Sequence, residues 1–529
     1  MSLPITHRSS SDAPAGSEAP PSPSMQRRQR IGLLLGPALA LVVYALFPSG
    51  AVDRVNAAAT AAGQEAAYTD AGLRTVAAAA VLLGLWWMTE AIPLAATALL
   101  PLVIFPGLQV AEFKEVATPY ASETIFLFMG GFMLALAMQK WNLHRRVALW
   151  VVLRVGTRPR TLVLGFMTAT GFLSMWVSNT ATAVVMLPIG TSVLSLVSSL
   201  VGGWRKMRRL STALMLGIAY AASIGSVGTI IGTPPNTLMV AYLSKEHGID
   251  IGFGQWMLVG VPLAVTLMVI AWWLLVYVLF RPEIDEIPGG QELMESEWRG
   301  LGPMSGGEVR VALVFVATAA SWVFVPTILE QVGSSLIISD ELIAMTSAVL
   351  LFLLPGDRAR GTRLMDWSTA KDLPWDVLLL FGGGLSLSTM FSRLGLSIWI
   401  GEQAKGLSGL PVVLLVAAVA LLVILLTELT SNTATAAAFL PIMGGVAVGV
   451  GLTSQTPGNV MLLVVPVALS ATFAFMLPVA TPPNAVAYGS GYIQIGDMVK
   501  AGIWLNVVGT VLVTLTVIGL VVPVFGLRL

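Results

Sequence analysis

Long apolar runs alternate with short polar ones along almost the whole chain. After a segment rich in Ser, Pro and Ala (residues 1–25), most runs are long enough for a helix that crosses a membrane, and they carry few charges. These runs lie near 31–47, 75–105, 161–204, 210–244, 252–280, 310–327, 340–354, 408–426 and 503–525. The pattern predicts an all-α polytopic membrane protein.

Two further apolar segments are short for a membrane span and are interrupted by glycines. The first contains Gly130 and Gly131, and the second contains Gly382 to Gly384. Irregular backbone is tolerated at membrane depth only where protein or water surrounds it. We therefore expect re-entrant hairpins at 123–145 and 376–402, with helix breaks at these glycines.

The second half of the chain repeats motifs of the first half at a nearly constant offset. Ser-Asn-Thr-Ala-Thr-Ala occurs at 178–183 and 431–436, and Thr-Pro-Pro-Asn occurs at 233–236 and 481–484. The offset is 253 for Phe128 and Phe381 (381 − 128), for Asn179 and Asn432 (432 − 179) and for Pro188 and Pro441 (441 − 188), and 248 for Asn236 and Asn484 (484 − 236). An internal duplication in a membrane chain is typical of transporter folds. Hydropathy alone leaves open whether the copies are inverted.

Both motifs place polar groups inside apolar runs, where such groups are costly unless they have partners. Ser, Asn and Thr donate and accept hydrogen bonds, and the paired prolines cannot continue a helical hydrogen-bond ladder. The N-terminal ends of broken helices can hold an anion, and their carbonyl-bearing ends can hold Na⁺. A lone Ser-Asn-Thr would more often join helices, and a lone Pro-Pro would more often form a turn. The duplicated combination favours one shared binding site.

Composition supports a membrane protein and argues against several other functions. The 529 residues are 56% hydrophobic and 11% charged, against roughly a quarter charged in soluble proteins. The net charge of +1 implies no nucleic-acid partner. The chain has no cysteine, and His7, His144 and His247 are scattered along it. An enzyme would need a nucleophile, a metal cluster or acid–base groups, and the uncharged motif windows contain none.

Charge patterning divides the chain into segments. Residues 1–30 are expected to form a disordered cytoplasmic tail, because Arg27, Arg28 and Arg30 precede the first span. Residues 31–280 hold the first repeat, 281–308 form an acidic linker that is expected to be solvated, and 309–529 hold the second repeat. The expected location is the plasma (inner) membrane, with several crossings.

Two acidic residues lie within apolar runs. Glu90 shortly precedes Pro93, which favours a helix end near the interface over an intramembrane carboxylate. Glu428 is the only charge between Lys405 and Asp497, and Met175 occupies the matching position in the first repeat. A proton antiporter would want paired acidic residues here. We therefore expect Glu428 to be structural or to tune a cation site.

By these motifs and their spacing, the chain from about residue 30 resembles the divalent-anion/sodium symporter family of di- and tricarboxylate transporters. The resemblance implies about eleven transmembrane helices in two inverted repeats, with two opposed hairpins, the N-terminus inside and the C-terminus outside. It also implies a homodimer. Each protomer would have a scaffold domain and a transport domain that moves like an elevator.

The resemblance further implies site residues. Substrate carboxylates are expected to meet Ser178, Asn179, Thr180, Thr233, Ser431, Asn432, Thr433 and Thr481. A first Na⁺ is expected at Ser174, Ser178, Asn179 and the backbone of Gly232, and a second at Thr427, Asn432 and the backbone of Thr430 and Ala480.

The leading hypothesis is Na⁺-coupled symport of a C4-dicarboxylate such as succinate, malate or fumarate. The windows 161–204, 210–244 and 429–496 contain no basic residue, so Na⁺ is expected to balance the substrate charge. Two alternatives stay open. One is a dicarboxylate exchanger without net Na⁺ coupling, and the other is a carrier of citrate, sulfate or arsenite with the same fold.

Overall fold

The computed structural model describes residues 23–61, 67–156, 158–201, 203–287, 289–332, 336, 338–357, 361–454 and 456–529. In these ranges the secondary structure is helical, and no strand is formed. Most of the tail predicted at 1–30 lies outside the described residues, but its last residues already belong to helix α1 (Pro23–Leu46).

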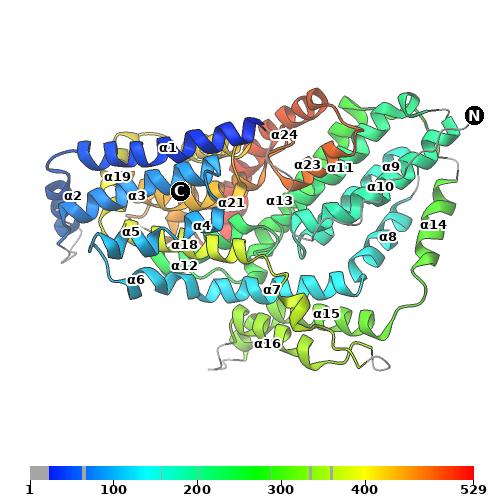
Figure 1. Cartoon of the computed structure of the whole chain (residues 1–529), viewed down its shortest axis with the longest axis horizontal. Coiled ribbons are helices and arrows are strands. Elements are labelled where there is room, and N and C mark those ends of the chain that lie inside the picture. Colours follow the sequence, from blue (N-terminus) through cyan, green and yellow to red (C-terminus); the bar gives the residue numbers. More distant parts are fainter. Residues whose placement is uncertain are drawn as a thin grey trace, which may run out of the picture.

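The segment from α1 to α14 covers the first half of the chain and the connection to the second half (Figure 1). After α1, its elements are α2 (Ala51–Ala61), α3 (Asp70–Thr89), α4 (Leu94–Ala98), α5 (Pro101–Gly107), α6 (Phe113–Ala117), the 3-10 helix η1 (Thr118–Ala121), α7 (Glu123–Lys140), α8 (Leu143–Val155), α9 (Pro159–Ser174), α10 (Asn179–Val201), the 3-10 helix η2 (Trp204–Met207), α11 (Arg208–Ser226), α12 (Pro234–His247), α13 (Phe253–Trp273), the π-helix η3 (Leu274–Leu279) and α14 (Gly290–Gly300).

The second half begins with α15 (Gly306–Gln331). It continues with α16 (Asp340–Leu353), α17 (Trp367–Ala370), α18 (Trp375–Arg393), α19 (Leu396–Ala404), the 3-10 helix η4 (Lys405–Leu407), α20 (Val412–Thr427), α21 (Asn432–Gly449), the 3-10 helix η5 (Pro457–Val460), α22 (Met461–Thr472), α23 (Pro482–Gly489), α24 (Ile495–Thr516), the π-helix η6 (Val517–Val521) and α25 (Val522–Val524).

Many of these helices have the length and apolar character of membrane spans. In the described part of the chain, nine helices are long and apolar enough to cross a membrane, or up to ten if the bent pair Leu396–Leu407 and Val412–Thr427 forms one span. Shorter apolar helices cover Leu94–Gly107 and Pro457–Thr472. The polytopic all-α fold expected from the sequence is confirmed.

The glycine-rich segments do not break their helices. Helix α7 continues through Gly130 and Gly131, and α18 continues through Gly382 to Gly384. A Cβ on Gly130 would lie only 2.7 Å from the backbone of Ala344 in α16, so this glycine permits close helix packing rather than a turn. The helix breaks expected at these glycines are wrong. That 123–145 and 376–402 re-enter the membrane stays a prediction.

The acidic segment 281–308 is more ordered than a solvated linker. It contains α14, which packs against α8 and α10. Glu297 of α14 pairs with Arg145 at 2.7 Å, and the buried Glu308 pairs with the buried Arg146 at 2.9 Å. Acidic residues of this segment therefore bind basic residues of the first half.

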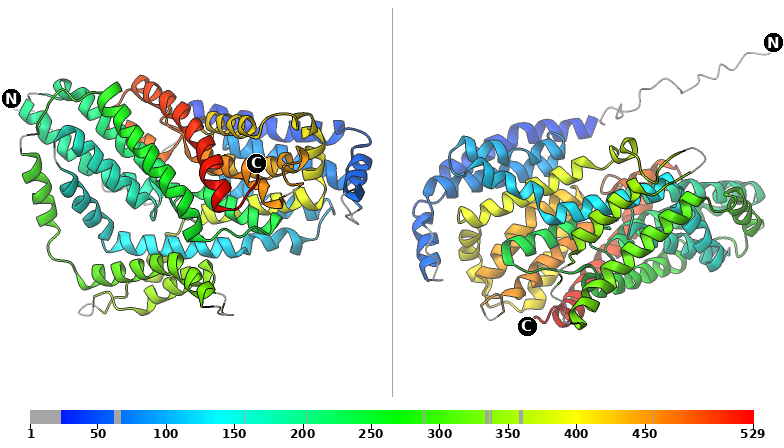
Figure 2. Two further views of the ribbon diagram at one scale, coloured as in Figure 1. Left: turned by 180° about the vertical axis from the view of Figure 1, so that it is seen from behind. Right: turned by 90° about the horizontal axis from the view of Figure 1, so that it is seen from below.

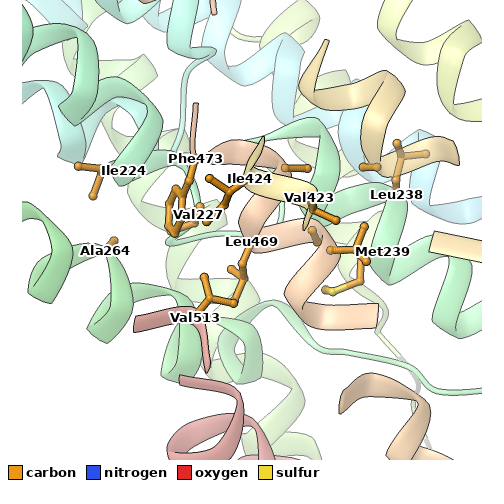
Figure 3. Packing of buried hydrophobic residues seen from close by; sticks show 14 of the residues in the cluster. Ile224, Val227, Leu238, Met239, Ala264, Val423, Ile424, Leu469, Phe473 and Val513 are labelled. Atoms are coloured by element: carbon orange, nitrogen blue, oxygen red, sulfur yellow. The ribbon is translucent and has the colours of Figure 1, made fainter. Parts of the chain in front are cut away.

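The same order of elements occurs twice. Helices α9 to α13 correspond to α20 to α24, each set with one break at Ser-Asn-Thr and one before Pro-Pro-Asn. Helices α9, α10, α11 and α13 run obliquely to α1 and α3, as the views from both sides show (Figures 1 and 2). Apolar side chains of both sets pack in one buried cluster, including Ile224 and Val227 from the first set and Ile424, Phe473 and Val513 from the second (Figure 3).

Candidate functional site

Four helix breaks, two in each repeat, meet at one cavity of about 830 Å³. They separate α9 from α10, α11 from α12, α20 from α21 and α22 from α23. The segments that form them all contribute lining residues. Two motifs that are about 250 residues apart in sequence therefore face the same space.

All eight residues expected to meet the substrate line this cavity. Thr233 and Thr481 are buried in its wall, whereas Ser178 and Thr180 are exposed. Of the residues expected to bind Na⁺, Ser174 and Thr427 are fully buried and do not line the cavity; the others do, namely Ser178, Asn179, Gly232, Thr430, Asn432 and Ala480. The structure thus brings the expected residues together, and their binding roles stay predictions.

The two Ser-Asn-Thr turns are held by matching hydroxyl contacts. Ser174 Oγ lies 2.9 Å from Asn179 Oδ1 and 2.6 Å from the carbonyl of Ala222. Thr427 Oγ1 lies 2.8 Å from Asn432 Oδ1 and 2.8 Å from the carbonyl of Ala471. A hydroxyl donates only one hydrogen bond at a time. Of the two acceptor oxygens near each hydroxyl, one is therefore left for another donor or a cation.

The asparagines of the two Thr-Pro-Pro-Asn motifs fix the irregular segments between helices. Asn236 and Asn484 are fully buried, and each side-chain amide donates to two carbonyls. These carbonyls belong to Val227 (3.2 Å) and Thr229 (2.9 Å) in the first repeat and to Ala474 (3.0 Å) and Leu477 (3.1 Å) in the second. The prolines stand at the start of α12 and α23, where a missing N–H costs nothing.

Helix ends give the cavity walls both signs of partial charge. Helices α10, α12, α21 and α23 begin at its wall, and their N-terminal ends each carry about half a positive charge. Helices α9, α11, α20 and α22 end at the same breaks, and the last carbonyls of a helix have no partner within that helix. The arrangement can hold an anion between N-terminal ends and small cations at the carbonyl-bearing ends.

Charged side chains also line the cavity. They are Arg28, Glu90, Asp372 and Asp376. Arg28 pairs with Glu90 at 3.2 Å and donates to the carbonyl of Leu429, beside the second Ser-Asn-Thr, at 3.3 Å. Glu90 caps α3 with a left-handed φ of 51°, which agrees with the helix end expected for it.

Sequence reasoning missed Arg28 as a cavity residue. It was assigned to a disordered tail because the apolar run begins only at Ile31. In the structure α1 begins at Pro23, so Arg28 is part of a helix that packs along α3. Trp86 Nε1 donates to the carbonyl of Gly32 at 3.1 Å in that contact. Asp372 and Asp376 belong to no sequence motif that would indicate a position in the cavity wall.

Two repeats of broken helices around one cavity that the polar motifs line, in a helical fold with many apolar spans, define a secondary transporter rather than an enzyme. Residues 69–526 match the family described as "Sodium:sulfate symporter transmembrane region". The chain belongs to this family, the divalent-anion/sodium symporters.

Relatives agree with this assignment, and two solved structures share the fold. The chain is 41% identical over 503 residues to the sodium-dependent dicarboxylate transporter SdcS of Staphylococcus saprophyticus, covering 94% of this chain and 92% of that protein. It is 40% identical over 503 residues to SdcS of Staphylococcus aureus, with the same coverage. The YdaH transporter of Alcanivorax borkumensis is similar in structure, with a TM-score of 0.54 and 14% identity over 85% of this chain and 99% of that chain. MtrF of Neisseria gonorrhoeae has a TM-score of 0.53 and 12% identity over 80% and 87%. At such low identity these two structures show the fold alone.

Proposed function

We propose that this chain is a Na⁺-coupled symporter of C4-dicarboxylates such as succinate, malate or fumarate. One substrate binds between the two Ser-Asn-Thr turns, and Na⁺ binds at the adjacent helix ends. The SdcS relatives, which are sodium-dependent dicarboxylate transporters, support both the cation and the substrate class.

The charge balance of the cavity carries this proposal. One basic side chain, Arg28, faces three acidic ones, Glu90, Asp372 and Asp376, so the fixed side-chain charges total −2 (1 − 3). Arg28 is already paired with Glu90. A dicarboxylate adds two further negative charges, and burying even one unpaired carboxylate costs several kcal/mol. Helix ends supply only about half a charge each. Bound cations are therefore needed, and hydroxyl, amide and carbonyl oxygens suit Na⁺.

Substrate movement is proposed to follow an elevator mechanism within a homodimer in the plasma membrane, with a cytoplasmic N-terminus. The family resemblance supports the mechanism and the dimer. The basic residues Arg27, Arg28 and Arg30 before the apolar part of α1 support the orientation, because Lys and Arg favour the cytoplasmic side.

Uptake of radiolabelled succinate by purified protein in liposomes tests the proposal. With an inward Na⁺ gradient, wild-type protein is expected to accumulate succinate, and replacing Na⁺ by choline is expected to abolish accumulation. Asn179→Ala and Asn432→Ala are each expected to lower uptake at least 100-fold. Each variant removes an oxygen that faces both substrate and cation in the proposed site.

The same preparation distinguishes the alternatives. Exchange of internal for external succinate that is as fast in choline as in Na⁺ would favour the exchanger. Citrate or sulfate accumulation without succinate accumulation would favour the other carriers. Near-normal uptake by either asparagine variant, with each variant folded as judged by size-exclusion chromatography, would contradict a site shared by the two repeats.

A further inference from the structure

We propose that the carboxylate of Glu428 makes the two cation sites unequal, so that the second site binds Na⁺ more tightly and fills first. This inference rests on the proposed function. It concerns a residue that does not line the cavity but follows Thr427 and stands three residues before Ser431.

Glu428 is a buried acceptor for a row of backbone donors. Its Oε1 accepts from the N–H of Phe475 at 2.7 Å and from Met476 at 3.0 Å. Its Oε2 accepts from Met476 at 3.0 Å and from Leu477 at 3.3 Å. Asn506 Nδ2 of α24 donates to Oε1 at 2.8 Å. All of these bonds are donated to Glu428, as expected for an ionised carboxylate, which can only accept.

The carboxylate thus fixes the segment that holds the expected second site. Its backbone partners lie between α22 and α23, where Asn484 holds the carbonyl of Leu477 at 3.1 Å. The N–H of Ala480, whose own carbonyl is an expected Na⁺ ligand, donates to the same carbonyl at 3.2 Å. Glu428 therefore connects the turn at Thr427 to the segment at Ala480, so it is a positioning residue as well as a source of charge.

The first repeat holds the corresponding segment without a charge. Met175 stands where Glu428 stands in the second repeat (428 − 175 = 253). Thr229 donates to the carbonyl of Met175, and Trp256 Nε1 of α13 donates to the carbonyl of Val227 at 3.1 Å. The two repeats thus build similar turns with different electrostatics.

A fixed negative charge near one site favours a cation there. Glu428 is 3% exposed, and within the described part of the chain no Lys, Arg or His forms an ion pair with it. Interactions between charges are weakly screened in the interior. A Na⁺ bound at Thr427 and Ala480 would compensate this charge, whereas Met175, at the matching position of the first repeat, supplies no charge to a Na⁺ bound at Ser174 and Gly232.

The test is a Na⁺ titration of thermal stability, without substrate, on the full chain purified in detergent. Choline keeps the ionic strength constant. Wild-type protein is expected to respond in two phases, a tighter and a weaker one. Glu428→Gln is expected to weaken the tighter phase roughly tenfold, which corresponds to about 1.4 kcal/mol. Asn506→Leu removes one hydrogen bond but keeps the charge, so it is expected to stay within about twofold of wild type.

A second pair of variants assigns the phases to sites. Thr427→Val removes the hydroxyl of the second site and is expected to abolish the tighter phase. Ser174→Ala, its match in the first repeat, is expected to abolish the weaker phase. If Glu428→Gln does not fold, this pair still shows whether the second site is the tighter one, and the inference is overturned if it is not.

Two results would overturn the inference alone: loss of the tighter phase in Ser174→Ala, or a Glu428→Gln titration equal to wild type. A wild-type protein with no Na⁺ response would overturn the proposed function itself, and with it this inference.

Discussion

At Gly232, beside the expected first cation site, there is no room for even one side-chain atom. A Cβ there would lie 2.2 Å from the carbonyl oxygen of Ser226 and 3.1 Å from that of Met175. Both obstacles are backbone atoms, which cannot turn away as a flexible side chain can. The second repeat has Ala480 at the matching position (480 − 232 = 248), so the two sites are not interchangeable in shape.

Gly232→Ala is therefore expected to displace the carbonyls around the first site. Overpacking of this kind typically costs about 1–3 kcal/mol. We expect a lower Tm and a weakened Na⁺ dependence of succinate uptake, measured in the same liposomes. Ala480→Gly is the matched control, and it is expected to cost under about 1 kcal/mol, because it adds only backbone freedom. A wild-type Tm and Na⁺ dependence for Gly232→Ala would contradict this account of the wall.

The repeated motifs predicted part of the cavity lining but not all of it. Asn179 and Asn432 could be found because a polar motif repeated at a fixed offset inside apolar runs is difficult to explain otherwise. Arg28 could not be found, because its role depends on where α1 begins and on its packing along α3. Tertiary contacts of that kind leave no local signature.

Among the helices, the Pro-Pro pairs predicted the breaks better than the glycine runs did. The Pro-Pro pairs stand at the first turns of α12 and α23, since a proline is favoured where no helical N–H partner is needed. The glycines of α7 and α18 lie inside continuous helices, because close helix contacts favour small residues and leave the hydrogen-bond ladder intact. A glycine run in an apolar segment therefore indicates packing as readily as a turn.

The turns after α7 and α18 test the inverted relation of the repeats. Asn142→Cys and Ser392→Cys place single thiols at exposed positions near these turns, and the chain has no cysteine of its own. If the repeats are inverted, a membrane-impermeant maleimide is expected to label one of them in intact cells and the other only in inside-out vesicles. Labelling of both from the same side would contradict inverted repeats.

Across the whole molecule, α1 connects α3 to the second repeat at the cavity. Its Arg28 contacts Glu90 at the end of α3 and the carbonyl of Leu429 beside the second Ser-Asn-Thr turn. Both contacts are partly exposed to solvent, with the Arg28 and Glu90 side chains 34% and 31% accessible. Exposed ion pairs contribute under about 1 kcal/mol, so these contacts can break and re-form at little cost. That is a property suited to a contact between parts that move.

An elevator movement would change the distance between α1 and the second Ser-Asn-Thr turn while α1 and α3 stay together. Arg28→Cys with Leu429→Cys allows a cleavable bifunctional thiol reagent to join the moving contact. We expect cross-linking to lower the rate of succinate uptake at least tenfold and reductive cleavage to restore it. Tyr44→Cys with Arg74→Cys is the matched control, because Arg74 Nη1 of α3 donates to the carbonyl of Tyr44 in α1 at 3.1 Å. Its cross-linking is expected to leave uptake unchanged. Full uptake in the cross-linked Arg28 and Leu429 variant would show that the second turn does not leave α1 during transport, and would place the movement elsewhere.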